Sequence, residues 1–140
     1  NDVDIMIVTP AEDLTPVHRA LSTPRYSSLN EVTFQDEKTG LFLDLIPVVD
    51  DAQRAAFDRA SVAPIEGAKG IRVLSPEGLC LMLLREATYG DASRRGRRMV
   101  DLESLATDRD LDWAFLVPWV KRMEYREAYR DWKAEGKPPA

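Results

Sequence analysis

The sequence predicts an α+β fold, in which a small mixed β-sheet with flanking helices is followed by a C-terminal helical bundle. Short β-rich apolar runs bounded by turn residues occur before residue 75, and apolar residues at helical spacing dominate after it. The chain has 140 residues, enough for one domain with a substantial core. We therefore expect one domain in two lobes, an α/β lobe at residues 1–74 and a helical lobe at residues 75–140.

The first lobe is expected to supply the strands. Val3–Val8 reads as a central strand, because it is apolar and rich in β-branched residues. After it we expect, in order, a helix around residues 14–21, a hairpin of strands 31–35 and 41–48 about a turn at residues 36–40, a helix from residue 50 or 51 to residue 60, and a short strand at residues 71–74.

A strong helix start is expected at residues 75 and 76. Ser75 is placed as the N-cap and Pro76 lies in the first turn, positions that these residue types favour. The segment 79–87 is apolar nearly all round and is therefore expected to be buried. Further helices are expected at residues 92–106, 110–123 and 125–133, with Trp113, Trp119 and Trp132 packed between them.

Composition and charge narrow the classes of function. The hydrophobic fraction of 44% and the charged fraction of 31% are typical of globular proteins, and the net charge of −5 argues against generic coating of nucleic acid. The longest apolar run is far shorter than the roughly 20 residues of a membrane span. No signal-peptide pattern is present, and the single cysteine, Cys80, is expected in the core. We therefore expect a cytoplasmic protein without membrane contact.

Three aspartates interrupt the predicted strands. Side chains alternate along a strand, so Asp2 and Asp4 share one face, and Asp44 lies among apolar residues of the strand at 41–48. Carboxylates on a buried face of neighbouring strands would repel one another unless a cation compensated them. Because hard cations prefer oxygen ligands, the pattern predicts a Mg²⁺ site, with solvated strand ends as the alternative. The single histidine, His18, is expected on a helix surface, which disfavours a zinc site.

Five segments carry a resemblance to a known family. Asp2-Val3-Asp4-Ile5 matches an Asp-x-Asp motif on a strand, and Leu43-Asp44-Leu45-Ile46-Pro47 matches a second strand with a single aspartate. The other three segments are Phe57-Asp58-Arg59-Ala60, Ser75-Pro76-Glu77-Gly78-Leu79 and Arg97-Arg98-Met99-Val100-Asp101-Leu102. In this order and spacing they resemble the nucleotidyltransferase fold of polymerase-β-like enzymes. The details are similar to the small bacterial branch that includes abortive-infection type toxins, over roughly residues 1–106.

The resemblance implies a metal-dependent transferase that moves a nucleoside monophosphate from an NTP to an acceptor and releases pyrophosphate. Asp2, Asp4 and Asp44 would be both the metal ligands and the catalytic residues, with Mg²⁺ or Mn²⁺ as the cofactor. The implied acceptor is an RNA, in particular a tRNA, or a protein. A role in a toxin–antitoxin pair, with a cognate antitoxin as partner, is implied as well.

Five arginines are the expected contacts for the phosphates of a nucleotide or an RNA acceptor: Arg85, Arg94, Arg95, Arg97 and Arg98. A solvated helix start is the alternative for the run at residues 94–98, although the first turns of a helix disfavour positive charge. Asp101 is expected to be a structural partner of a nearby arginine.

Two departures from the family pattern bear on activity. In relatives a Gly-Ser loop upstream of the Asp-x-Asp motif holds the phosphates, whereas this sequence opens inside a predicted strand. Relatives often carry a lysine on the helix after Ser-Pro-Glu, where this chain has Leu83 and, two residues later, Arg85. We therefore expect an N-terminally truncated chain that is inactive alone.

The alternative function is that of a catalytically inactive nucleotidyltransferase-fold module that binds a partner protein or senses a nucleotide. A third interpretation is an interaction domain in which the aspartates have no function.

Overall fold

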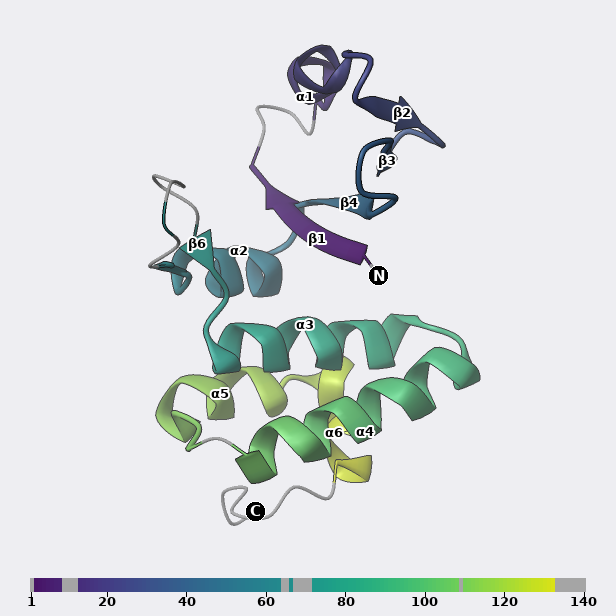
Figure 1. Cartoon of the computed structure of the whole chain (residues 1–140). Helices are drawn as coiled ribbons and strands as arrows, with labels where there is room; N and C mark the ends of the chain where they lie inside the picture. Colours follow the sequence, from purple (N-terminus) through teal and green to yellow (C-terminus); the bar gives the residue numbers. More distant parts are fainter. Residues whose placement is uncertain (1, 9–12, 64–65, 67–71, 109, 133–140) are drawn as a thin grey trace. The chain divides into compact units, whose positions relative to one another are not determined.

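The chain divides into a sheet unit, Asn1–Asp50, and a helical unit, Asp51–Ala140. The structure, a computed structural model, describes residues 2–8, 13–63, 66, 72–108 and 110–132 (Figure 1). The fold is α+β with a small mixed sheet and a larger helical part, as the sequence predicts. The two units divide after Asp50, whereas the predicted lobes divide after residue 74, so that the segment between these points belongs with the helices.

The sheet unit contains strands β1 (Asp2–Ile7), β2 (Tyr26–Ser28), β3 (Thr33–Asp36) and β4 (Phe42–Pro47), with helix α1 (Thr15–Leu21). The strand order is β1-β4-β3-β2, in which β1 runs parallel to β4 and the other pairs are antiparallel. The expectation that the first strand is central was wrong for the described strands. Strand β1 lies at an edge, and β4 lies between β1 and β3, which is the hairpin partner of β4. Val3 and Ile5 on β1 are accordingly exposed, at 44% and 39%.

The hairpin between β3 and β4 turns one residue later than the sequence suggests. Asp36 is the last residue of β3, and its N–H donates to the carbonyl of Leu41 at 2.8 Å. Gly40 has a φ of +71°, a left-handed conformation that glycine adopts without a Cβ clash, and its N–H donates to the Asp36 carbonyl at 2.7 Å. The loop therefore spans residues 37–40, and this sets the register that pairs Thr33 with Asp44.

An ion pair lies beside the loop of this hairpin. The Asp36 carboxylate is buried and accepts hydrogen bonds from Arg25 Nη2 at 2.7 Å and Nε at 3.1 Å. It also accepts from the backbone N–H of Lys38 at 3.0 Å. The Arg25 hydrogen bonds hold the pKa of Asp36 well below its usual range, outweighing the opposite effect of burial. The pair ties the start of β2 to the turn after β3.

Helix α1 contacts the sheet through His18. The imidazole ring packs edge-on against the buried ring of Phe34, with 5.1 Å between ring centroids, and its Nε2 lies 2.6 Å from the carbonyl oxygen of Glu31. His18 is therefore half-buried rather than on the open helix surface as expected, because its ring covers the side of β3 that carries Phe34.

The helical unit contains α2 (Asp51–Asp58), a small hairpin of β5 (Ser61–Val62) and β6 (Arg72–Val73), α3 (Pro76–Tyr89), α4 (Ala92–Asp108), α5 (Trp113–Val120), a 3₁₀ turn η2 (Met123–Tyr125) and α6 (Arg126–Asp131). Helix α3 is its centre, with α4 running alongside it and α2, α5 and α6 also packed against it (Figure 1). Cys80, Leu81 and Leu84 on α3 are at most 1% exposed, as the apolar run predicts. Ser75 caps the helix by accepting a hydrogen bond from the Gly78 N–H at 3.0 Å.

Glu77 joins three elements at the start of α3. Its buried carboxylate accepts from the backbone N–H of Asp112 at 2.9 Å and from Arg59 Nε at 3.3 Å. Arg59 also donates to the Asp112 carboxylate at 2.7 Å and lies over the ring of Phe115. Burial alone would raise the pKa of Glu77, but these hydrogen bonds lower it instead. Two of the segments that carry the family resemblance, around Arg59 and Glu77, thus meet in one structural ion-pair cluster.

The last helices are shorter than predicted. Asp112 caps α5 by accepting from the Phe115 N–H at 3.2 Å, so the helix begins at Trp113 rather than at residue 110. Trp132 is fully buried, and its ring lies 5.4 Å from that of Trp113, measured between centroids. These two tryptophans pack within the unit as expected, while Trp119 lies half-buried under the guanidinium of Arg122.

Candidate functional site

The structure brings the three predicted carboxylates together at one end of the β1–β4 pair. One carboxylate oxygen from each of Asp2, Asp4 and Asp44 lies within 4.8 Å of the others. Asp4 is directly opposite Asp44, and Asp2 is opposite Phe42, because β1 and β4 run parallel in this register. Paired residues on adjacent strands point to the same face and alternate residues share it, so all three aspartates lie on one face of the sheet.

The aspartate face is more open than the sequence suggests. Asp2 and Asp4 are exposed, and only Asp44 is half-buried. The expectation of a buried face was therefore wrong for β1, because this strand lies at an edge of the described sheet and its carboxylates reach water. Asp44 is the member of the group that has lost part of its hydration, since β4 has a strand on each side.

Thr33 is a fourth side chain at the site, and sequence reasoning missed it. Its Oγ1 donates a hydrogen bond to Asp44 Oδ1 at 2.7 Å. Thr33 lies opposite Asp44 in the antiparallel β3–β4 register, so Asp4, Asp44 and Thr33 form a row across three strands. The signal that would have found it is the hairpin loop length, because a loop of residues 37–40 pairs residue 33 with residue 44.

The chemistry of the donors fits a hard divalent cation. Three carboxylates this close repel one another when ionised, and a divalent ion between them replaces that repulsion with attraction. An all-oxygen donor set of this kind suits Mg²⁺ or Mn²⁺, whereas zinc sites are built mainly from cysteine and histidine. An exposed site also leaves room for water and substrate oxygens to complete the coordination shell.

The five predicted arginines belong to the helical unit. Arg95 pairs with Asp131 at 2.6 Å and Glu127 at 3.2 Å, both on α6. Arg98 pairs with Glu86 on α3 at 2.5 Å and with Asp101 at 3.1 Å, so Asp101 is a structural partner as expected. These two arginines hold helices together.

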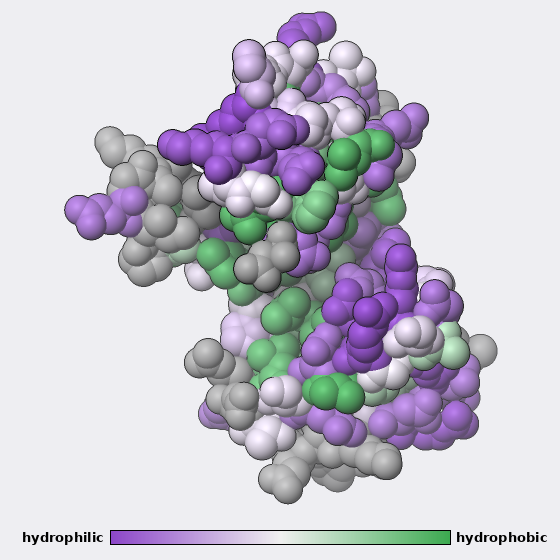
Figure 2. Space-filling view, turned by 45° about the vertical axis from the view of Figure 1, so that its right-hand side comes forward, coloured by the Kyte–Doolittle hydropathy of each residue, from purple (hydrophilic) through white to green (hydrophobic). Residues whose placement is uncertain are grey.

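The other three arginines differ from Arg95 and Arg98 in their surroundings. Arg94 and Arg97 are exposed on α4, and Arg85 lies over the ring of Tyr89 on α3. Hydrophilic residues cover much of the visible surface of the helical unit, with separate hydrophobic areas between them (Figure 2). Contact of these arginines with a nucleotide or with RNA stays a prediction.

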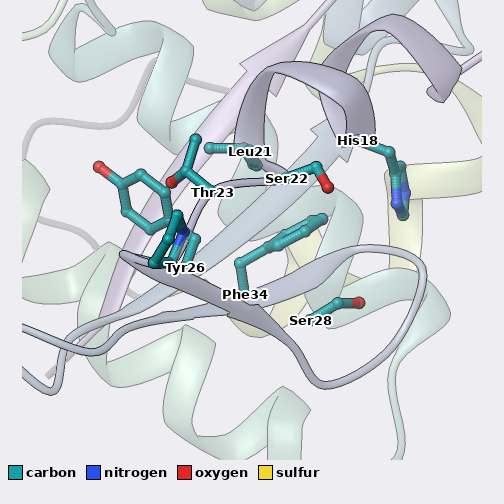
Figure 3. A pocket seen from close by; sticks show the side chains of 8 residues that line it. His18, Leu21, Ser22, Thr23, Tyr26, Ser28 and Phe34 are labelled. Atoms are coloured by element: carbon teal, nitrogen blue, oxygen red, sulfur yellow. The ribbon is translucent and has the colours of Figure 1, made fainter.

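A pocket of about 440 Å³ lies on the opposite face of the same sheet. Phe34 and Tyr26 carry its aromatic lining, and Leu21 and His18 line it from α1. Figure 3 shows Phe34 between His18 on one side and Tyr26 on the other. Residues of β3 alternate between faces, so the ring of Phe34 and the hydroxyl of Thr33 point to opposite sides. Among the described residues that line it there is no carboxylate, and the pocket is separate from the aspartate site.

Comparison with protein-family models, curated proteins and solved structures finds no match for this chain. In the part of the chain that the structure describes, no helix has the length and apolar character needed to cross a membrane.

Proposed function

We propose that this protein is a metal-dependent nucleotidyltransferase that transfers a nucleoside monophosphate from an NTP to an acceptor hydroxyl. The observation that carries the proposal is the convergence of Asp2, Asp4 and Asp44 on one face of two parallel strands. Two carboxylates spaced by one residue on a first strand and a third on its neighbour are also the pattern of the family that the sequence resembles. The geometry and the resemblance therefore support the same chemistry.

In this proposal Asp2, Asp4 and Asp44 hold Mg²⁺ or Mn²⁺. The bound cation would neutralise the triphosphate and orient it for in-line attack. The acceptor oxygen forms a bond to the α-phosphorus, the bond from that phosphorus to the pyrophosphate oxygen breaks, and pyrophosphate leaves. Asp44 is the carboxylate best placed to receive the acceptor's proton, because its surroundings are the least hydrated of the three.

The acceptor class follows the resemblance and is an RNA, in particular a tRNA, or a protein. Of the five predicted arginines, Arg94 and Arg97 are exposed and would contact the phosphates of the nucleotide or of an RNA acceptor. A role as the toxin of a toxin–antitoxin pair in the bacterial cytoplasm, with a cognate antitoxin as protein partner, belongs to the same proposal.

A second candidate is a nucleotidyltransferase-fold module without catalysis that binds a partner protein or senses a nucleotide. The ion pairs of Arg95 and Arg98 favour the form of this candidate that binds a partner protein, because acidic side chains of the same unit already hold two of the five predicted phosphate contacts. A nucleotide sensor would bind an NTP without consuming it.

The test is thermal unfolding of the full-length protein with Mg²⁺ and each of the four NTPs in turn. Pyrophosphate is then measured after tRNA or a protein extract has been added as acceptor. The parent is compared with Asp4→Asn and with the control Glu31→Gln, which removes an exposed carboxylate from the same unit. A ligand at 100 times its Kd adds about 2.7 kcal/mol of stability, which raises Tm by several degrees. The proposal predicts a Mg²⁺-dependent shift with at least one NTP that Asp4→Asn abolishes, together with pyrophosphate release. A shift without pyrophosphate supports the second candidate, and no shift with any NTP contradicts both nucleotide proposals.

A further inference from the structure

We propose that Thr33 is a positioning residue of the carboxylate site, whose hydroxyl holds Asp44 in the orientation that binds the cation. The inference rests on the proposed function, since it requires a cation at the three aspartates. It goes beyond that function because it assigns a role to a residue outside the Asp-x-Asp and single-aspartate motifs. Thr33 touches Asp44 and would act through it.

The strand register brings the two side chains close together. The Leu45 N–H donates to the Val32 carbonyl at 2.8 Å and the Asp36 N–H donates to the Leu41 carbonyl at 2.8 Å. These ladder bonds flank Thr33 and Asp44 and leave them as a pair without hydrogen bonds between their own backbones. In antiparallel sheets such pairs have the shorter separation, with Cα atoms about 4.5 Å apart, and their side chains interact most strongly.

The backbone of Thr33 is held on its other side by the preceding loop. The Asn30 side-chain Oδ1 accepts from the Thr33 N–H at 2.8 Å and from the Val32 N–H at 2.9 Å. The Leu29 N–H donates to the Thr33 carbonyl at 2.9 Å. Because threonine is β-branched, its χ1 is restricted once the backbone is held. These backbone bonds and the branched side chain therefore restrict the position of the hydroxyl before any ligand binds.

The hydrogen bond leaves Asp44 free to bind a cation. A carboxylate offers about four lone-pair sites, and Thr33 Oγ1 occupies one of those on Oδ1. The bond restricts rotation of the carboxylate about its side-chain axis, so less conformational entropy is lost when the cation binds. Outer partners of this kind orient metal ligands, and losing one costs about 10–100-fold in metal affinity.

The experiment measures the affinity of the chain for Mn²⁺ alone, by calorimetric titration with electron paramagnetic resonance of the free ion as a second readout. Thr33→Val keeps the shape and β-propensity but removes the hydroxyl, and Thr33→Ser restores the hydroxyl on a smaller side chain. Gln35→Ala is the matched control, because Gln35 lies on the same strand and face opposite Phe42 rather than Asp44. Thermal unfolding in EDTA verifies that each variant folds, and Thr33→Ala replaces Thr33→Val if the latter does not.

We expect Thr33→Val to bind Mn²⁺ about 10–100-fold more weakly than the parent, with Thr33→Ser within a few-fold of the parent and Gln35→Ala unchanged. A merely structural role would lower Tm in EDTA and leave the affinity for Mn²⁺ unchanged. If the parent binds Mn²⁺ through the aspartates and Thr33→Val binds equally well, the inference fails while the proposed metal site stands. If the parent binds no Mn²⁺, both fail.

Discussion

Asp4 on β1 lies directly opposite Asp44 on β4 in a parallel strand pair, with Asp2 beside them. Like charges in this position oppose strand pairing, whereas any of the apolar residues common in strands would support it. The metal-free sheet therefore bears an electrostatic cost that a divalent cation would relieve. The repulsion can be measured as a loss of stability in EDTA, and its relief as a gain of stability when the cation is added.

Asp44→Asn should stabilise the metal-free protein and weaken its response to Mg²⁺. The substitution removes one of the repelling charges but keeps an Oδ1 that accepts the hydrogen bond from Thr33, and the expected gain is on the order of 0.5 kcal/mol in EDTA. Calorimetry is the suitable readout, because Trp113, Trp119 and Trp132 all belong to the helical unit and their fluorescence would not report on the sheet. A lower Tm for Asp44→Asn in EDTA would contradict the repulsion on which this prediction depends.

Asp36→Asn should destabilise the sheet unit at pH 7 and have little effect in strong acid. The Arg25 hydrogen bonds lower the pKa of Asp36 in the folded state. A carboxyl with a lowered folded pKa contributes stability above its unfolded pKa of about 3.9 and loses that contribution as the pH falls through the folded value. The Tm difference between parent and variant should therefore be largest at neutral pH and shrink steadily below about pH 4. A difference that stays constant down to pH 2 would show that packing, and not charge, makes the pair stabilising.

Gly78→Ala should destabilise the helical unit, whereas Gly96→Ala should stabilise it. A Cβ at Gly78 would lie 3.2 Å from the carbonyl oxygen of Ala56, so the backbone of α2 would have to shift by a few tenths of an ångström, whereas a Cβ at Gly96 meets nothing within 4 Å. Overpacking of this kind costs about 1–3 kcal/mol, partly offset by the helix propensity of alanine. At Gly96 the substitution raises the free energy of unfolding by up to about 1 kcal/mol through that helix propensity alone. Denaturation followed by tryptophan fluorescence measures both, and equal effects at the two glycines would rule out close packing at Gly78.

The aspartate cluster was predictable from sequence because its geometry follows from strand alternation and a single parallel pairing. Asp2 and Asp4 must share a face of any strand, and the apolar run around Asp44 requires a strand as well. Thr33 was not found, because Asp36 was assigned to the turn when it is the last residue of β3. In a hairpin, an error of one residue in the turn changes every cross-strand pair. The ion pair between the exposed Arg25 and the buried Asp36 connects residues 11 apart, and no local pattern reveals it.

The helices were predicted well where capping and apolar periodicity agree, as at Ser75 and along α3. The placement of α2 and β6 with the helical unit depends on contacts that propensity does not encode, such as Arg59 with Glu77 and Asp112. The ion pairs of Arg95 and Arg98 are of the same kind, since Asp131 and Glu86 are 36 and 12 residues away in the chain. Sequence periodicity identifies which residues share a face, whereas the partners that neutralise charges depend on the tertiary arrangement.

The most direct test of the central claim is calorimetric titration of Mn²⁺ into the parent, Asp4→Asn, Asp44→Asn and the control Glu31→Gln, with Mg²⁺ as a competitor. The account predicts saturable Mn²⁺ binding to the parent and the control that Mg²⁺ displaces, and binding weakened at least tenfold in both aspartate variants. Equal binding by the parent and Asp44→Asn, or no binding by the parent, would contradict the claim that Asp2, Asp4 and Asp44 form a divalent-cation site.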